Sequence, residues 1–252
     1  MAKADYPVLS GAPIVEAVLD IRVTFSENIN IDTVHALHEK IKNQFPIEQQ
    51  QYAFTGEFQL RPQKDKIESS SSSGALINGY LFYSEDKKKI FQARLSGFTF
   101  HLQKPYSTWN EFKAEARRYW EIYKDSLKPL TINRVALRYI NKIELGAKFT
   151  PTKYFQTIPV LGKKLAGYEM NNLFSQITIK NPGINAKANI TQGVEPPSPG
   201  QEIVSNFVFD IDTYCVGDFN EEEIWNKFEE LRDFKNEIFF ESITEETLNL
   251  LK

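Results

Sequence analysis

The sequence predicts an α+β fold in which a largely antiparallel sheet is packed on one side by three helices. The chain of 252 residues contains nineteen Phe and eleven Tyr, many of them beside Thr, Val or Ile, and these residue types favour strands. Several segments alternate between apolar and polar residues, as strands with one buried face do. Three other segments place apolar residues three and four positions apart, which is typical of helices.

The first predicted elements are a strand and a helix. Residues 14–25 alternate between apolar and polar side chains, which indicates a half-buried strand. The first helix is predicted over residues 32–45, because Asp32 is a suitable N-terminal cap, an apolar stripe follows, and Pro46 ends it.

A group of strands follows this helix. A strand is predicted over residues 52–61, and a flexible loop is predicted near 64–75 because this segment contains five consecutive serines. Turn residues then separate three predicted antiparallel strands, at 76–83, 90–95 and 98–102.

The second helix has the clearest signals in the chain. Thr108 and Glu111 have the spacing of a capping box, and the aromatic residues that follow form one stripe. The helix is predicted over residues 108–127, Pro129 closes it, and a strand is predicted over 134–145.

The remaining predicted elements are a short helix over residues 151–158, three strands, and a third long helix over 221–236 capped by Asn220. Ser242 is predicted to cap a terminal helix, and a proline-rich loop is predicted near 193–201. The strands are predicted over residues 168–180, 185–191 and 203–213.

We expect these elements to form a single domain over residues 1–252, with sub-halves at 1–150 and 151–252. The pattern of a strand and a helix at residues 14–45 recurs at 203–239. We interpret this recurrence as a duplicated strand-helix unit.

The predicted strand over residues 134–145 has one charged face. Its alternation places Arg134, Arg138 and Lys142 on the side opposite its apolar residues. Three cations in a row could grip a phosphate or the carboxylates of a partner, or they could pair with acids on a neighbouring strand.

Four acidic residues are candidate partners of this row. Two of them project from the first strand, and the other two share one side of a later strand. These carboxylates could hold Mg²⁺ for phosphoryl chemistry, or they could form cross-strand ion pairs with the arginines. The candidate binding residues are therefore Arg134, Arg138, Lys142, Glu16, Asp20, Asp210 and Asp212.

No catalytic residue, metal site or cofactor is predicted. His35, His38 and His101 lie in no known metal-binding spacing, and Cys215 has no evident base beside it. The sequence contains no Walker loop and no Gly-x-Gly-x-x-Gly, Gly-x-Ser-x-Gly or His-Glu-x-x-His motif. These absences favour a protein that is not an enzyme, and they leave open a site assembled from distant residues.

The charge distribution predicts contacts with a partner. The net charge of −3 and the pI near 5.8 argue against a surface that attracts nucleic acid everywhere. Residues 104–144 contain nine Lys or Arg against five Asp or Glu, whereas residues 218–246 contain three against eleven. Separated charge of this kind favours a homo-oligomer or a protein partner.

We expect a cytoplasmic location. The single cysteine, Cys215, cannot form an internal disulfide, which fits a reducing compartment. No signal peptide opens the sequence, and no apolar run approaches the ~18 residues that cross a bilayer. No membrane partner is therefore predicted.

Four blocks of sequence together resemble a family of proteins. They are residues 11–18 (GAPIVEAV), 105–112 (PYxxWxxF), 134–141 (RVALRYIN) and 235–244 (KNxIFFxSIT). Their order and spacing resemble a sporadically distributed, uncharacterised family of prokaryotic proteins of about this length. The resemblance covers nearly the whole chain, and it implies a bacterial or archaeal cytoplasmic protein of an accessory system, either a defence system or a toxin-antitoxin-like one. It implies no catalytic residue and no cofactor.

Three functions follow in order of preference. The first is a non-enzymatic binding or assembly protein, because charge is segregated and the usual catalytic motifs are missing. The alternative is a nucleic-acid-binding protein or metal-dependent nuclease that uses the basic strand face. The third is a small-ligand binder with a pocket between the sheet and the helices.

Overall fold

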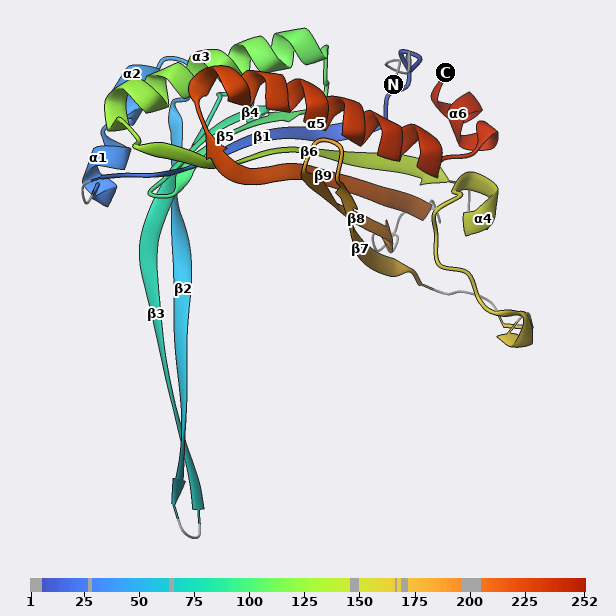
Figure 1. Cartoon of the computed structure of the whole chain (residues 1–252), viewed down its shortest axis with the longest axis horizontal. Helices are drawn as coiled ribbons and strands as arrows, with labels where there is room; N and C mark the ends of the chain where they lie inside the picture. Colours follow the sequence, from blue (N-terminus) through green and yellow to red (C-terminus); the bar gives the residue numbers. More distant parts are fainter. Residues whose placement is uncertain are drawn as a thin grey trace.

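The computed structural model describes residues 6–26, 29–63, 66–145, 150–165, 167–168, 172–195 and 205–252. Within these residues, nine strands form one antiparallel sheet in the order β2-β3-β4-β5-β1-β6-β9-β8-β7 (Figure 1). The strands are β1 (Ile14–Thr24), β2 (Ile47–Gln63), β3 (Lys66–Tyr83), β4 (Lys89–Arg94), β5 (Gly97–Gln103), β6 (Thr131–Leu145), β7 (Phe174–Asn181), β8 (Ala186–Glu195) and β9 (Ser205–Phe219).

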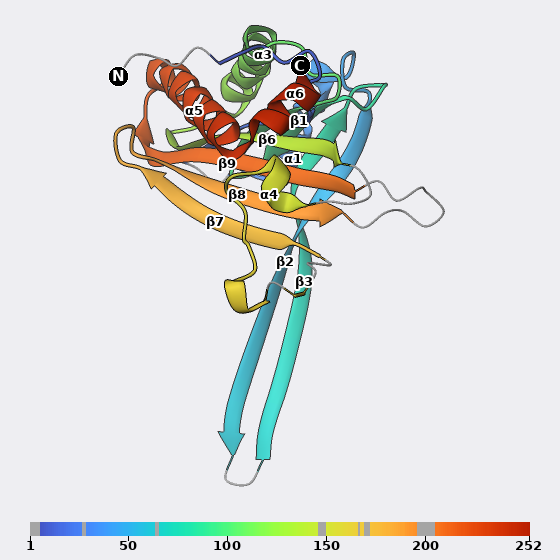
Figure 2. The same ribbon diagram turned by 90° about the vertical axis from the view of Figure 1, so that its right-hand side faces the viewer.

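Helices α1, α2, α3 and α5 lie on one face of this sheet (Figures 1 and 2). The predicted α+β class with an antiparallel sheet is therefore confirmed. The helical segments are α1 (Ile31–His35), α2 (His38–Ile41), α3 (Trp109–Leu127), α4 (Pro151–Tyr154), the 3-10 turn η1 (Lys163–Leu165), α5 (Glu221–Ser242) and α6 (Glu245–Leu251).

The topology contains two similar units that meet at the centre of the sheet. In the first unit, β1 pairs with β5, the last strand of a meander, and β5 leads into α3. In the second unit, β6 pairs with β9 in the same way, and β9 leads into α5. The duplicated strand-helix unit inferred from the sequence was therefore assigned to the wrong strands, because the topology relates β1 to β6 rather than to β9.

The helix predicted over residues 32–45 is divided into α1 and α2. The break occurs where the amide of Leu37 bonds to the carbonyl of Val34, three residues earlier, in place of a partner four residues earlier. Val34, Leu37 and Ile41 are nevertheless all buried, so the apolar stripe keeps its contact with the core across the break.

The serine run at residues 69–73 is part of strand β3, and the loop predicted near 64–75 is wrong for residues 66–75. Strands β2 and β3 pair continuously from Ile47↔Tyr83 to Gln63↔Lys66, and they form a long hairpin that extends away from the sheet (Figure 1). Backbone pairing with β2 holds this segment extended, and local polarity gives no signal of such pairing. In the other predicted loop, residues 193–195 belong to β8 and residues 196–201 lie outside the described residues.

The helix starts follow the predicted capping chemistry in two cases out of four. Asn30, rather than the predicted Asp32, caps α1, and its side chain accepts a hydrogen bond from the Thr33 amide at 2.9 Å. Thr108 accepts a hydrogen bond from the Glu111 amide at the start of α3, and Asn220 forms a complete capping box with Glu223 at the start of α5. The cap of α6 is Thr244, whereas Ser242, the predicted cap, is the last residue of α5. Helix α5 therefore runs six residues beyond its predicted end at 236.

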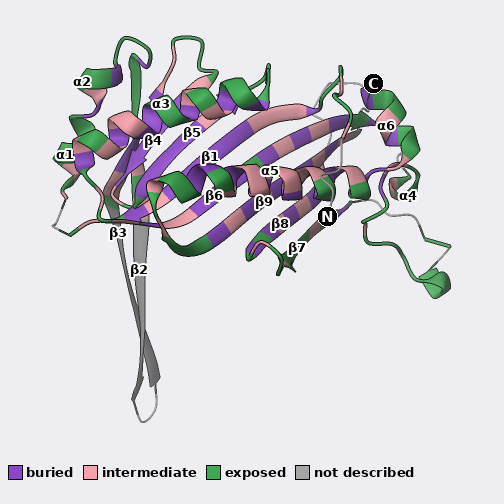
Figure 3. Ribbon diagram, turned by 45° about the horizontal axis from the view of Figure 1, so that its top comes forward, coloured by how far each residue is buried: buried purple, intermediate pink, exposed green. Residues whose placement is uncertain are grey.

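The main core lies between the sheet and helices α3 and α5 (Figure 3). Helix α3 buries Trp120 and Tyr123 against Phe98 of β5, and Phe112 against Phe100 of the same strand. Each such side chain contributes roughly 1.5–3 kcal/mol when it is removed from water. This packing fixes the helices on one face of the sheet and leaves the other face for the charged residues.

Candidate functional site

The seven residues predicted to bind a ligand lie together on the face of the sheet opposite α3 and α5. They alternate with buried residues such as Leu19 and Leu137, which face the helices. Strand β6 lies between β1 and β9 in the sheet, so the candidate acidic residues lie on the strands next to the candidate cations. The seven residues are Glu16 and Asp20 on β1, Arg134, Arg138 and Lys142 on β6, and Asp210 and Asp212 on β9.

Asp20 is the centre of a buried polar cluster. Its two carboxylate oxygens accept hydrogen bonds from Arg94, from Thr99 at 2.6 Å, from Arg134 at 2.8 Å and from Arg22 at 3.0 Å. Burial opposes the ionisation of Asp20, but these partners together outweigh burial and lower its pKa. The carboxylate is therefore charged and fully engaged within the protein.

The other two cations of the row are paired as well. Arg138 forms two parallel hydrogen bonds to Asp210, at 2.9 and 2.6 Å, which is the strongest geometry available to this pair. Lys142 pairs at 2.5 Å with Glu195 of β8, an acid that the sequence did not single out. The arrangement is that of cross-strand ion pairs, one of the two interpretations that the sequence left open.

The two remaining acids make weaker or different contacts. Asp212 lies 3.6 Å from Arg134 and 3.4 Å from Asn189, and burial raises its pKa. Glu16 is 2.8 Å from the Nδ1 atom of His101, and this hydrogen bond lowers the pKa of Glu16. Within the described residues, no group of three or more His, Cys, Asp or Glu side chains is arranged to hold a metal ion.

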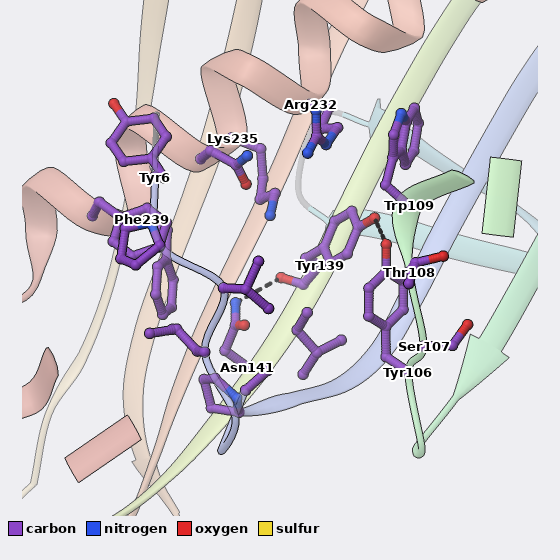
Figure 4. A pocket seen from close by; sticks show the side chains of 18 of the residues that line it. Tyr6, Tyr106, Ser107, Thr108, Trp109, Tyr139, Asn141, Arg232, Lys235 and Phe239 are labelled. Atoms are coloured by element: carbon purple, nitrogen blue, oxygen red, sulfur yellow. Dashed lines mark hydrogen bonds between the residues drawn. The ribbon is translucent and has the colours of Figure 1, made fainter. Parts of the chain in front are cut away.

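A cavity of about 420 Å³ lies on the other side of the sheet, among the helices (Figure 4). Its volume falls within the range of small-molecule sites, roughly 300–1,000 Å³. Its walls are residues 6–14 of the N-terminal segment, residues 106–110 at the start of α3, and one face of α5 between Glu229 and Phe240. Tyr139 and Asn141 of β6 complete the lining.

Lys235 of α5 directs its amine into this cavity (Figure 4). The Nζ atom lies 4.1 Å from the centroid of the Tyr139 ring, and in the described part of the chain Lys235 forms no ion pair. Burial, with the nearby charge of Arg232, lowers the pKa of Lys235 to about 7. Lysines shifted in this way serve as bases or nucleophiles in many proteins.

Two tyrosines connect the sheet to the segment before α3. The hydroxyl groups of Tyr106 and Tyr139 lie 2.9 Å apart and share a hydrogen bond. Burial raises the pKa of both residues, most strongly that of Tyr139, so both hydroxyls keep their protons. Beside them, the side-chain amide of Asn141 donates to the backbone carbonyl of Phe209 at 2.9 Å, which fixes its orientation.

The second cation of the cavity is Arg232, one helical turn before Lys235. Its guanidinium lies 5.9 Å from the centroid of the Trp109 ring and 3.7 Å from Asp233. The nearest acid on the wall is Glu229, which accepts two hydrogen bonds of 3.0 Å from the Trp109 indole and pairs with Lys113. Glu229 is thus neutralised by its own partners, and the cavity has an excess of positive charge.

The opposite end of the cavity is apolar and aromatic. Tyr6 stacks on Phe240 with ring centroids 4.6 Å apart and planes 3° from parallel. The segment that carries Tyr6 is held in place by backbone bonds, since Gly11 donates to the carbonyl of Leu251 at 3.0 Å. The cavity therefore offers a cationic end and an apolar end to the same ligand.

Four sequence segments, residues 11–18, 105–112, 134–141 and 235–244, all contribute to this cavity. Ala12 and Pro13 come from the first segment, Tyr106 and Trp109 from the second, and the third supplies Tyr139 and Asn141. The last segment begins with Lys235 itself. Segments that lie far apart in the sequence thus converge on one site.

The sequence did contain a signal for Lys235. On α5, the buried side chains of Phe228, Leu231, Ile238 and Phe239 mark the face that packs against the sheet. Lys235 is four residues after Leu231 and three before Ile238, so it interrupts an apolar stripe. Burying a lysine at such a position costs free energy unless a partner compensates its charge, so the interruption marks Lys235 as a candidate binding residue. The charge count over residues 218–246 did not reveal this.

Comparison of the chain with protein-family models, with curated proteins and with solved structures gives no match. None of the helices in the described ranges combines the length and the apolar character needed to cross a membrane. The fold and the cavity define an α+β protein with a cationic pocket between its sheet and its helices.

Proposed function

We propose that this chain is a small-molecule-binding protein and that its ligand occupies the cavity at Lys235. The observation that carries the proposal is the Lys235 amine, which enters the cavity over the Tyr139 ring without a carboxylate partner among the described side chains. A partly buried ammonium group without a carboxylate partner is unfavourable in the absence of a ligand, and an anionic ligand would offset that penalty.

The chemistry of the walls indicates the class of ligand. Arg232 presents a planar guanidinium, which suits a carboxylate or a phosphate, and Lys235 adds a second cationic group. Phe239, Phe240 and Tyr6 line the other end and suit an apolar or aromatic body. We therefore propose an amphiphilic small anion as the ligand.

The test is thermal unfolding in the presence of phenylacetate, benzoate and phenyl phosphate at pH 6.5. A probe at ten times its dissociation constant should add about 1.4 kcal/mol of stability, which corresponds to a rise in Tm of about 3–5 °C. The rise should disappear in the double variant R232Q/K235M. It should persist in K227M, which removes a lysine of α5 that pairs with Glu230 and does not line the cavity.

Two results would overturn the proposal. One is the absence of any concentration-dependent rise with all three probes. The other is an equal rise in the wild-type protein and in R232Q/K235M, because the stabilisation would then arise elsewhere.

The nucleic-acid alternative has less support than small-molecule binding, because the cations of the basic strand face are already paired. Arg134, Arg138 and Lys142 each already contact a carboxylate of the same sheet, so a phosphate would have to compete with these contacts.

Assembly into a homo-oligomer remains a separate proposal based on the segregated charge. Light scattering at moderate and high salt tests it, and a monomer at every concentration would contradict it.

A further inference from the structure

We propose that Lys235 captures a carbonyl compound that bears an anionic group by forming an imine with it. This proposal rests on the proposed binding function and specifies the ligand as an aldehyde or 2-oxo compound with a carboxylate or phosphate. Three features of the cavity support it: the desolvated, unpaired amine of Lys235, the position of Arg232, and the Tyr139 ring beneath the amine.

The amine of Lys235 is suited to act as a nucleophile. An amine must be unprotonated to attack a carbonyl carbon, and lysines reach that state when they are desolvated or placed beside another cation. Lys235 meets both conditions, since it lies inside the cavity one turn from Arg232 and forms no ion pair in the described part of the chain. A carboxylate partner would instead have kept it protonated.

Arg232 is placed to hold the anionic group while Lys235 reacts. The two residues are separated by three positions on one helix, and side chains with this spacing are neighbours, with their Cβ atoms ~5–6 Å apart. A carboxylate bound to the guanidinium would therefore bring an adjacent carbonyl group close to the Lys235 amine. Such positioning converts a bimolecular reaction into an effectively unimolecular one.

The reaction needs no additional reagent. The Lys235 nitrogen forms a bond to the carbonyl carbon, and one of its protons passes to the carbonyl oxygen, which gives a carbinolamine. Loss of the hydroxyl group together with the second nitrogen proton releases water and leaves a carbon-nitrogen double bond. Nothing is oxidised or reduced, and addition of water reverses both steps.

The ring of Tyr139 stabilises the charged form of the product. An imine that binds a proton becomes an iminium cation, and aromatic faces attract cations. The Lys235 nitrogen already lies 4.1 Å from the centroid of the Tyr139 ring. The hydroxyl of Tyr139 is held by Tyr106 and keeps its proton, so the ring remains a neutral phenol beneath the cation.

Reductive trapping tests the proposal. The full-length protein is incubated at pH 7 with phenylpyruvate, pyruvate or glyoxylate, reduced with sodium borohydride, and analysed by intact-mass and peptide mass spectrometry. At this pH about half of the Lys235 amines are neutral, against roughly one in 3,000 for an ordinary lysine with a pKa of 10.5. We expect one stable adduct, located on Lys235, with a trapping rate about tenfold or more above that of any other lysine.

Matched variants separate the roles of the two cations. K235R keeps the positive charge but cannot form an imine, so it should lose the adduct, whereas K227R on the same helix should retain it. R232Q should lower the trapping of phenylpyruvate by about tenfold and leave the trapping of neutral benzaldehyde unchanged. K235R should also remain folded, which far-ultraviolet circular dichroism would check.

The outcomes distinguish this proposal from the broader one. If phenylacetate raises the Tm and no adduct forms on Lys235, imine formation is wrong and non-covalent binding stands. If neither occurs, both proposals are wrong. Adducts distributed evenly over surface lysines would also overturn imine formation at Lys235, because they would show no preference for the cavity.

Discussion

Replacing Lys235 by methionine should stabilise the folded protein near neutral pH. Methionine has a similar length and flexibility but carries no charge, so it fills the same space beside Tyr139 without a desolvation penalty. The substitution should therefore separate the energetic cost of the amine from the packing of its side chain. Most substitutions of buried residues destabilise proteins, so a gain in stability would be informative in itself.

The pKa of Lys235 sets the sign and the size of the effect. It is 10.5 for an ordinary lysine and about 7 in the folded protein, where burial lowers it. Between these values the unfolded chain binds a proton that the folded chain lacks, so stability rises with pH across this interval. Below about pH 7 both states are protonated, and the folded state carries the full penalty.

That penalty has an upper limit of about 5 kcal/mol, because the pKa differs by about 3.5 and each pKa unit corresponds to about 1.4 kcal/mol. Lys235 as a residue is only partly buried, since it lines the cavity, and solvent there screens part of the penalty. We therefore expect K235M to gain about 2–3 kcal/mol at pH 6, and the gain to diminish as the pH approaches 10.

Urea unfolding of wild-type protein and K235M at pH 6, 7.5 and 9.5 would measure this. The other ionisable groups around the amine, Arg232, Glu229, Tyr106 and Tyr139, are present in both proteins, so the difference between the two curves isolates Lys235. K227M serves as the control and should change stability by less than about 1 kcal/mol, because the Lys227–Glu230 pair is partly exposed to solvent, which screens it. A loss of stability in K235M at pH 6, or a difference that does not depend on pH, would refute the reasoning.

Three further substitutions test the scaffold by chemical denaturation. D20N should destabilise the protein by about 3 kcal/mol, because it leaves the buried guanidinium of Arg94 without its carboxylate; a change below about 1 kcal/mol would contradict this. G97A should lower the free energy of unfolding by more than about 2 kcal/mol, since Gly97 has φ of 148° and an added Cβ would lie 2.2 Å from the carbonyl oxygen of Ile21. An unfolding free energy equal to that of the wild type would argue against this backbone conformation. N220A should cost about 1 kcal/mol through loss of the capping box of α5, and an unchanged unfolding midpoint would count against that cap.

Local chemistry allowed much of the secondary structure to be predicted. The capping residues Thr108 and Asn220 mark the starts of α3 and α5, and strict alternation marks β1 and β6. Two features depend on tertiary structure instead. The serine run is extended because β2 pairs with it, and the interruption near Leu37 changes the helix without changing its buried face. Neither feature has a signature in the local sequence.

The charged face of the sheet was also predictable in part. Alternation on β6 placed Arg134 and Arg138 on one face, and ion pairs with neighbouring acids were one of the two interpretations. The cavity was harder to foresee because Tyr6, Tyr106 and Lys235 come together only when the two topological units meet. Periodicity identifies the face on which a side chain lies, whereas the partners across that face depend on the order of the strands.

The two faces of β6 are connected by its register. Arg138 and Tyr139 are adjacent in sequence and point to opposite faces, so a slip of one residue would exchange them. The paired hydrogen bonds from Arg138 to Asp210 oppose such a slip, since Asp210 is fixed on the neighbouring strand. They thereby keep the Tyr139 ring beneath the Lys235 amine. The ion pair of Arg138 with Asp210 on one face of β6 thus positions Tyr139 on the other face, where its ring lines the cavity that we propose as the ligand site.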